Sequence, residues 1–220
     1  MSPPRGVDIV AKRSEAFSCY SHLGGAIAGA AGLVALLILT WGRWDFMVVA
    51  LVYGLAVTAL FSFSATYHAL KKQESEKTIW RKLDHIAIFI MIAGSYTPLV
   101  YIYLDGLWRV FMIVIPWTIV AIGVFYKLFW IHAPRILSPI LYLAMGWLAL
   151  APMKQLWQSM PRLAFWGMVA GGVSYSIGAV IYAFKRPNPV PGVFGFHDIF
   201  HIWIIIGASF HFAVIVSAIT

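Results

Sequence analysis

Charged side chains and cysteines are both scarce in this sequence. Only 11% of its 220 residues are charged, whereas soluble domains average about 25%. The chain is 61% hydrophobic, with a mean hydropathy of +0.84, and a water-soluble fold could not cover so much apolar surface. The single cysteine, Cys19, excludes a disulfide within the chain and a metal cluster built from thiolates. These shortages predict an integral membrane protein.

Acidic residues are half as numerous as basic ones, so the formal net charge is +8. In a soluble protein this excess would suggest a nucleic acid partner. Here the basic residues lie in short segments between apolar runs, where control of topology and contact with anionic lipid explain them better. We therefore expect membrane lipid, and no nucleic acid, as the partner. We also expect no cleavable signal peptide, because the first 16 residues are polar and the first apolar run is too long.

Seven apolar runs are long enough, or nearly so, to cross a bilayer as helices. They span residues 17–40, 46–68, 84–103, 110–130, 136–153, 163–184 and 196–219. The first run is rich in glycine and alanine, which favours close helix packing. Pro116 predicts a kink in the fourth run, and Pro139 stands in the first turn of the short fifth run. The predicted fold is all-α: a polytopic membrane protein with a seven-transmembrane helix bundle at 17–220 and a short cytoplasmic segment at 1–16.

The distribution of lysine and arginine predicts the orientation of the bundle. Twelve of the sixteen basic residues fall in the N-terminal segment and in the second, fourth and sixth connections, all on one side. Because positive residues favour the cytoplasmic side, the N-terminus is expected in the cytoplasm and the C-terminus outside. The expected location is a bacterial cytoplasmic (inner) membrane.

Two histidines, His197 and His201, stand at the start of the last run. A spacing of four places both imidazoles on one helix face, as a helix offers two nitrogen ligands to one metal ion. Taken alone, the pair fits a metal site or two interfacial histidines equally well. Ionisable residues in membrane segments are costly, however, and usually functional.

The predicted topology brings further polar residues to the depth of this histidine pair. Ser64 and His68 end the second span, and Asp84 begins the third, at the same cytoplasmic face. Three imidazoles with a fourth position open to water form the ligand set of a catalytic zinc site. Neutral imidazoles suit Zn²⁺, while a lone carboxylate and no thiolate argue against calcium or an iron–sulfur cluster. Asp84 can then hold a ligating histidine or the bound water. The alternative is a hydrogen-bonded polar cluster without metal. His85 and His211 point or lie away from this group.

Four motifs of this region occur together in a known family: Ser64-x-x-x-His68, Lys82-Leu83-Asp84, Gly94-Ser95-Tyr96-Thr97-Pro98 and His197-x-x-x-His201. With seven spans, they resemble the hemolysin III family, the bacterial branch of the progestin and adipoQ receptor (PAQR) superfamily. The resemblance implies His68, His197 and His201 as ligands of a zinc ion on the cytoplasmic side. It implies Asp84 and Ser64 beside the bound water.

One motif departs from the family pattern. Bacterial members often begin Glu-x-x-Asn-x-x-x-His; Glu15 and His22 match, but Ser18 stands in place of asparagine. The departure leaves the role of this N-terminal motif open.

Three functions compete at this stage. A zinc site at membrane depth favours a hydrolase of an amide or ester bond in an acyl lipid, and the superfamily's links to ceramidase activity and membrane lipid homeostasis imply the same chemistry. The first alternative is a lipid-sensing membrane protein or receptor with a structural zinc ion. The second is a pore-forming cytolysin, which the lack of a polar face on the seven runs disfavours.

Overall fold

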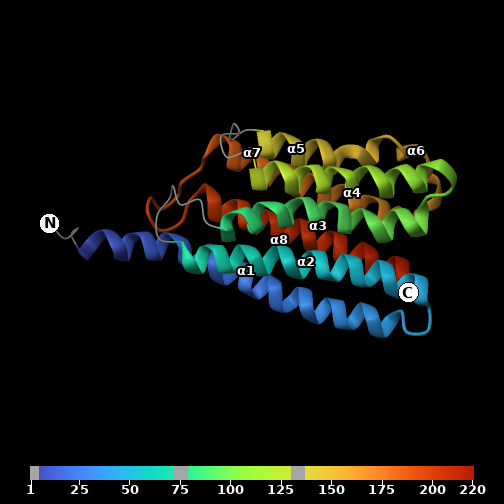
Figure 1. The fold of residues 1–220 in the computed structure, drawn as a ribbon, viewed down its shortest axis with the longest axis horizontal. Helices are drawn as coiled ribbons and strands as arrows, with labels where there is room; N and C mark the ends of the chain where they lie inside the picture. Colours follow the sequence, from blue (N-terminus) through green and yellow to red (C-terminus); the bar gives the residue numbers. More distant parts are fainter. Residues whose placement is uncertain (1–4, 72–78, 130–136) are drawn as a thin grey trace.

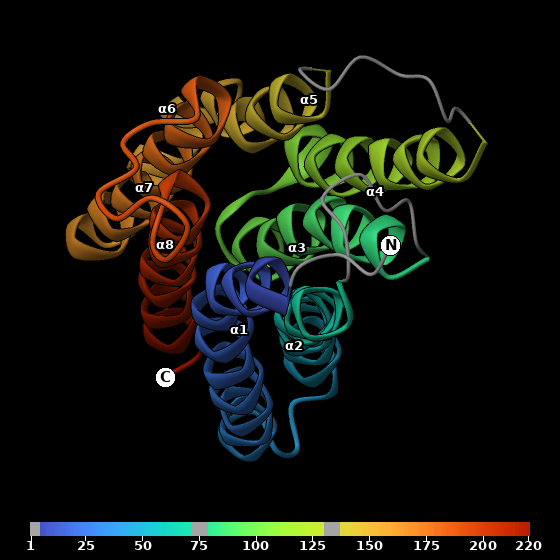
Figure 2. The ribbon, with the colours of Figure 1, turned by 90° about the vertical axis from the view of Figure 1, so that its left-hand side faces the viewer.

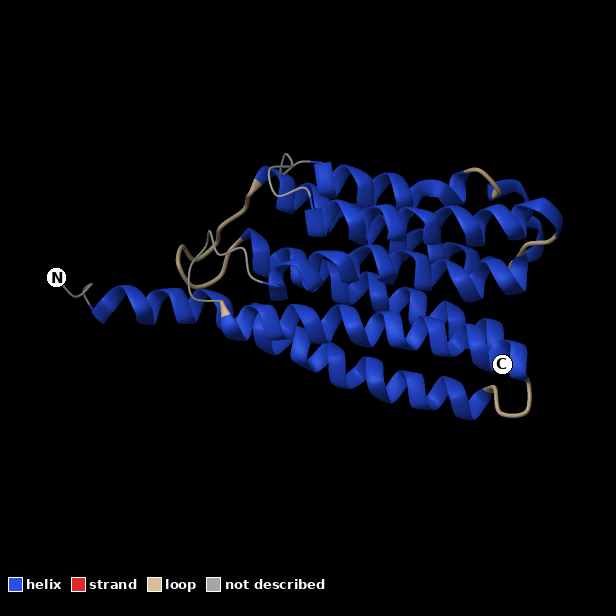
Figure 3. Cartoon of the chain, viewed as in Figure 1, coloured by secondary structure: helices blue, strands red, loops and turns tan. Residues whose placement is uncertain are grey.

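The computed structural model describes residues 5–71, 79–129 and 137–220, with side chains from Glu15 onward. Helices account for nearly all of this part of the chain (Figure 3). They are α1 (Arg5–Leu39), α2 (Trp44–Leu70), α3 (Ile79–Tyr103), α4 (Gly106–Phe129), α5 (Leu137–Gly146), the 3₁₀ helix η1 (Trp147–Leu150), α6 (Met153–Ser159), α7 (Arg162–Phe184) and α8 (Phe196–Ile219). The only sheet-like pairing among the described residues is an isolated bridge between Val190 and Phe194. The all-α prediction is therefore confirmed.

Six helices are long and apolar enough to cross a membrane: α1 from Glu15 onward, α2, α3, α4, α7 and α8. The predicted fifth span, 136–153, does not form one straight helix. Instead α5 and η1 run to Leu150, and α6 then leaves at an angle of 56°. Pro152 stands at this break, and a proline has no N–H with which to continue the backbone hydrogen bonds of a helix. The described residues thus form six candidate spans, or seven if the bent pair is counted as one. Positions 130 and 136 of the predicted spans lie outside the described residues.

The helices are arranged in a bundle in which the last helix meets the first (Figure 2). α8 packs against α7 on one side and against α1 on the other, and it also touches α3. The end of α2 and the beginnings of α3 and α8 lie at the same end of the bundle (Figure 1). The predicted common depth of these three helix ends is therefore confirmed, while the side of the membrane that they face stays a prediction.

The first helix packs through small residues, as its sequence predicted. A Cβ atom on Gly29 would lie 3.1 Å from the Val57 side chain of α2. A Cβ on Gly32 would lie 2.8 Å from the Phe212 ring of α8. Such close approach is how membrane helices gain packing without a hydrophobic drive between them. α1 is thereby held in contact with both α2 and α8.

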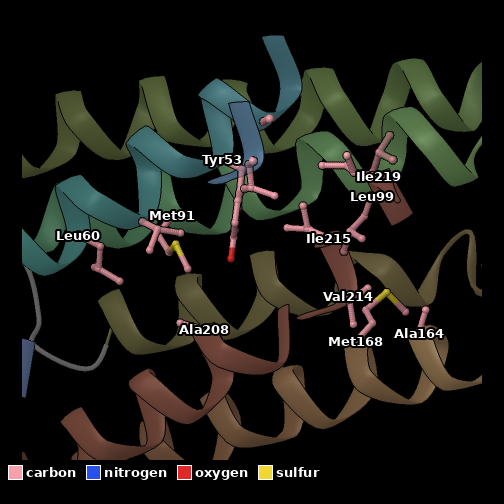
Figure 4. Close-up of a cluster of buried hydrophobic side chains, with 14 of the residues drawn as sticks. Tyr53, Leu60, Met91, Leu99, Ala164, Met168, Ala208, Val214, Ile215 and Ile219 are labelled. Atoms are coloured by element: carbon pink, nitrogen blue, oxygen red, sulfur yellow. The ribbon is translucent and has the colours of Figure 1, made fainter. Parts of the chain in front are cut away.

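The apolar core lies between α2, α3, α7 and α8, where Tyr53, Met91, Leu99, Met168 and Ile215 are packed together (Figure 4). Large apolar side chains also cover the outside of the bundle, including Ile38, Leu55, Ile122, Phe125 and Val180. Exposed apolar surface on this scale requires hydrocarbon as its solvent. The protein is therefore an integral membrane protein.

Candidate metal centre

The beginning of α8 is fixed by polar contacts that set the position of its two histidines. Asp198 Oδ2 accepts a hydrogen bond from the backbone N–H of Gly195 at 2.9 Å, and Asp198 Oδ1 accepts one from Ser18 Oγ at 2.9 Å. The first contact satisfies a backbone group at the helix N-terminus. The second ties α8 to α1. His197 and His201, on either side of Asp198, therefore start from an anchored first turn.

Three histidines from two helices meet at this point. His68, two residues before the end of α2, places Nε2 3.3 Å from Nε2 of His197. Nε2 of His201 lies 3.1 Å from the same His197 atom, and the ligand atoms of all three residues lie within 4.8 Å of one another. His68 and His201 are buried, and His197 is half-buried. Residues 129 positions apart are thus brought together, as the sequence predicted.

Two of these distances, from His197 Nε2 to His68 Nε2 and to His201 Nε2, are close to those expected around a tetrahedral zinc ion. Nitrogen ligands about 2.05 Å from zinc, at tetrahedral angles, lie about 3.3 Å from one another. Imidazole nitrogens suit Zn²⁺ and several other transition metals. In the part of the chain that is described, no carboxylate or thiol joins this cluster of mutually close ligand atoms. The three residues can therefore hold a metal ion and leave a fourth position open, while the identity of the metal is not fixed by the geometry.

A carboxylate from α1 supports one of the three imidazoles. Glu15 Oε2 lies 2.6 Å from His68 Nδ1, and Glu15 Oε1 lies 2.6 Å from Lys71 Nζ. The side chain of His68 is 1% exposed and that of Glu15 is 19% exposed. The contact therefore sits at the edge of the buried site, on the side opposite the ring nitrogen that faces His197.

A fourth histidine, His22 of α1, lies against the group. Its ring stacks on that of His201, with centroids 3.7 Å apart and planes inclined by 20°. The Phe61 ring of α2 meets His22 edge-on at 5.0 Å. His22 is 2% exposed, and within the described part of the chain neither of its ring nitrogens has a hydrogen-bond partner. The His22 ring thus packs flat against one face of the His201 ring.

The two predicted polar partners, Ser64 and Asp84, lie on α2 and α3. Ser64 is buried one turn before His68 on α2. Asp84, near the start of α3, is close enough to His68 and His22 to interact with them electrostatically. Its Oδ2 atom lies 3.4 Å from Nδ1 of its neighbour His85. Asp84 is thus beside the site but outside the cluster of close ligand atoms.

His85 and His211 take no part in the cluster. His85 Nδ1 donates to the Arg81 carbonyl at 2.7 Å, within its own helix. His211 lies ten residues beyond His201 on α8, where Nε2 is 3.3 Å from the Met168 carbonyl of α7. Both lie outside the cluster, as their spacing predicted.

Comparison with known proteins agrees with this architecture. The family model described as "Haemolysin-III related" matches residues 10–212. The chain belongs to this family. It is 31% identical over 202 residues to "Hemolysin-3" of Bacillus cereus, which covers 91% of this chain and 89% of that protein. It is 30% identical over 177 residues to the "Hemolysin-3 homolog" of Bacillus subtilis, covering 79% and 82%.

A more distant relative extends the likeness beyond bacteria. The "ADIPOR-like receptor IZH2" of Saccharomyces cerevisiae is 28% identical over 233 residues, covering 90% of this chain and 69% of that protein. This likeness supports the placement of the haemolysin-III-related chain in the wider PAQR superfamily.

The contacts of α1 are the part of this haemolysin-III-related site that sequence reasoning left open. Glu15, Ser18 and His22 follow one another at intervals of three and four, so they share one face of a helix. In the structure, that face meets His68, Asp198 and His201 in turn. The helical spacing of these three residues indicated a shared face. The three residues lie at the start of the first apolar run, however, and the predicted span began only at residue 17.

Proposed function

We propose that this protein is a zinc-dependent hydrolase that cleaves an amide or ester bond in an acyl lipid. The observation that carries the proposal is the convergence of three Nε2 atoms, with no fourth ligand atom among the described residues close to all of them. His68, His197 and His201 would hold the ion. A zinc ion with an open position lowers the pKa of water to about 7 and polarises a carbonyl.

The remaining side chains supply the other parts of a hydrolysis. Asp84 would accept the proton of the attacking water and pass it to the leaving amine or alcohol, so that water and the acyl lipid give a fatty acid and the freed amine or alcohol. Ser64 would donate a hydrogen bond to the oxyanion that develops on the acyl carbonyl. Ser64 is buried one turn before His68 on α2, and Asp84 on α3 is close enough to His68 and His197 to interact with them electrostatically.

The location of the site favours a lipid substrate. The three histidines lie at one end of a bundle whose outer surface is apolar, so the site sits near the level where acyl chains meet their headgroups. We propose that this end faces the cytoplasm of a bacterium, that the protein resides in the cytoplasmic membrane, and that its role is the homeostasis of membrane lipid.

The experiment is an assay of acyl release by the purified protein in lipid nanodiscs. A ceramide and a phospholipid with labelled acyl chains test the amide and the ester. Turnover should disappear with a zinc chelator, return with added Zn²⁺, and be absent in His197→Ala. Asp45→Asn is the matched control, because Asp45 bonds to Tyr101 at the start of α2, far from the histidines. Turnover that survives both the chelator and His197→Ala would refute the mechanism.

One observation favours a second function, a lipid sensor with a structural ion. The ligands come from α2 and α8, which are joined chiefly through α1 and α3. A metal bound by the three histidines would therefore link α2 and α8, which otherwise have little direct contact. The free energy of metal binding would then contribute to the free energy of folding. A protein that binds zinc in equal molar ratio and gains stability, but releases no fatty acid from either lipid, would support this function over the hydrolase.

A further inference from the structure

Glu15 uses both carboxylate oxygens on the second helix. One oxygen lies 2.6 Å from His68 Nδ1 and the other 2.6 Å from Lys71 Nζ. The carboxylate comes from 53 residues earlier in the chain than the imidazole. It is only 19% exposed, so the contact is more than a solvent-screened surface pair.

The contact fixes which nitrogen of His68 carries the proton. A carboxylate only accepts hydrogen bonds, so Nδ1 must be the N–H donor. In a neutral imidazole, the other nitrogen, Nε2, then keeps its lone pair. That atom is the one that faces His197 at 3.3 Å. The bond therefore prepares the ring, in tautomer and in orientation, to act as a metal ligand.

Among the described residues, no carboxylate makes an equivalent contact with His197 or His201. Nδ1 of His201 has no hydrogen-bond partner among the described residues, and its ring is held by stacking on His22 instead. Of the three candidate ligands, His68 is thus the one whose tautomer is set by a carboxylate. Removal of that carboxylate should change the metal centre through His68.

We infer that Glu15 is a positioning residue for the metal centre: its carboxylate orients His68 and raises the basicity of Nε2, while Lys71 holds the second carboxylate oxygen. The inference rests on the proposed metal site but not on hydrolysis. Carboxylate partners of ligating histidines typically account for 10- to 100-fold in metal affinity. The competing explanation is that Glu15 serves only as an ion-pair partner that joins α1 to α2 through Lys71.

The test measures zinc affinity by competition with a chromogenic chelator in the wild type, Glu15→Gln, Glu15→Ala and Lys71→Met. Affinity should fall about 10-fold in Glu15→Gln, which retains a neutral acceptor, and by up to about 100-fold in Glu15→Ala. Lys71→Met removes the ammonium but leaves the carboxylate on His68, so its affinity should stay within about twofold of wild type. Asp45→Asn, which breaks a carboxylate contact with Tyr101 at the far end of α2, should bind zinc like wild type.

Two further measurements separate positioning from general stability and from catalysis. Thermal unfolding in excess chelator measures how much stability each variant loses in the absence of metal. The zinc affinity of Glu15→Gln should fall by more than this loss of stability explains. X-ray absorption at the zinc edge should show a longer or more disordered Zn–N shell in Glu15→Ala. Wild-type affinity in both Glu15 variants, an equal loss in Lys71→Met, or a wild type that binds no zinc would each overturn the inference. A wild type that binds zinc with the expected Glu15 effect but cleaves no lipid would overturn the hydrolase alone.

Discussion

Two neighbouring glycines in α1 offer a test of how packing supports the metal centre. A Cβ atom on Gly25 would lie 2.7 Å from Cδ1, 2.8 Å from Cγ and 3.0 Å from Cε1 of Phe61. Ordinary carbon contacts are 3.5–4.0 Å, so the ring would have to move by roughly 1 Å. Phe61 is 3% exposed and lies edge-on to His22, which stacks on His201. At Gly24, by contrast, a Cβ would meet no heavy atom within 4 Å.

The expected cost follows from these contacts. An extra methyl group in a well-packed interior destabilises by about 1–3 kcal/mol. Alanine in place of a helical glycine returns roughly 0.5–1 kcal/mol through backbone entropy. Gly24→Ala should show that gain alone, so the difference between the two variants isolates the packing cost. We predict that Gly25→Ala is about 1–3 kcal/mol less stable than Gly24→Ala.

The assay is the free energy of unfolding of each purified variant in mixed micelles, measured with and without zinc. The zinc affinity of the two variants should also differ, because Phe61 transmits the displacement through His22 to His201. Equal stability of Gly24→Ala and Gly25→Ala would show that α1 and α2 are not in the close contact described. Unequal stability with equal zinc affinity would show that the displacement ends before the metal centre.

Two more predictions test the other helices and the ion. A Cβ at Gly171 would collide with the His211 ring of α8, whereas a Cβ at the adjacent Gly172 would meet no heavy atom within 4 Å. The free energy of unfolding of Gly171→Ala should therefore be about 1–3 kcal/mol lower than that of Gly172→Ala. Equal free energies of unfolding would contradict the α7–α8 packing. Zinc at about 100 times its dissociation constant should raise the free energy of unfolding of the wild type by about 2.7 kcal/mol. That gain should vanish in His201→Ala, and a gain of the same size in this variant would place the ion elsewhere.

The meeting of His68 with His197 and His201 could be predicted from the sequence because it depends on two strong signals. Long apolar runs mark where α2 ends and α8 begins, and alternation of spans puts both points at one face. The i, i+4 spacing then places the α8 histidines on one side of their helix. Neither signal requires knowledge of how the helices pack.

The bend in the fifth span and the role of Glu15 depend on weaker signals. Hydropathy counts residues 136–153 as one run, although Pro152 interrupts the backbone hydrogen bonds there. At the other site, α1 is helical from Arg5, well before its apolar run begins, because backbone hydrogen bonds do not stop where apolar side chains do. Glu15 therefore lies on a helix face that a hydropathy window treats as a polar tail.

The contacts of α1 explain why a helix that provides none of the three candidate ligands should still control the metal centre. It touches the ligand-bearing end of α2 through Glu15 on His68, and the beginning of α8 through His22 on His201. Farther along, Gly32 lies against Phe212, again on α8. Since α2 and α8 have little direct contact with each other, the separation of their imidazoles is set by what lies between them. A change that tilts or shifts α1 should therefore alter the metal affinity of the three histidines.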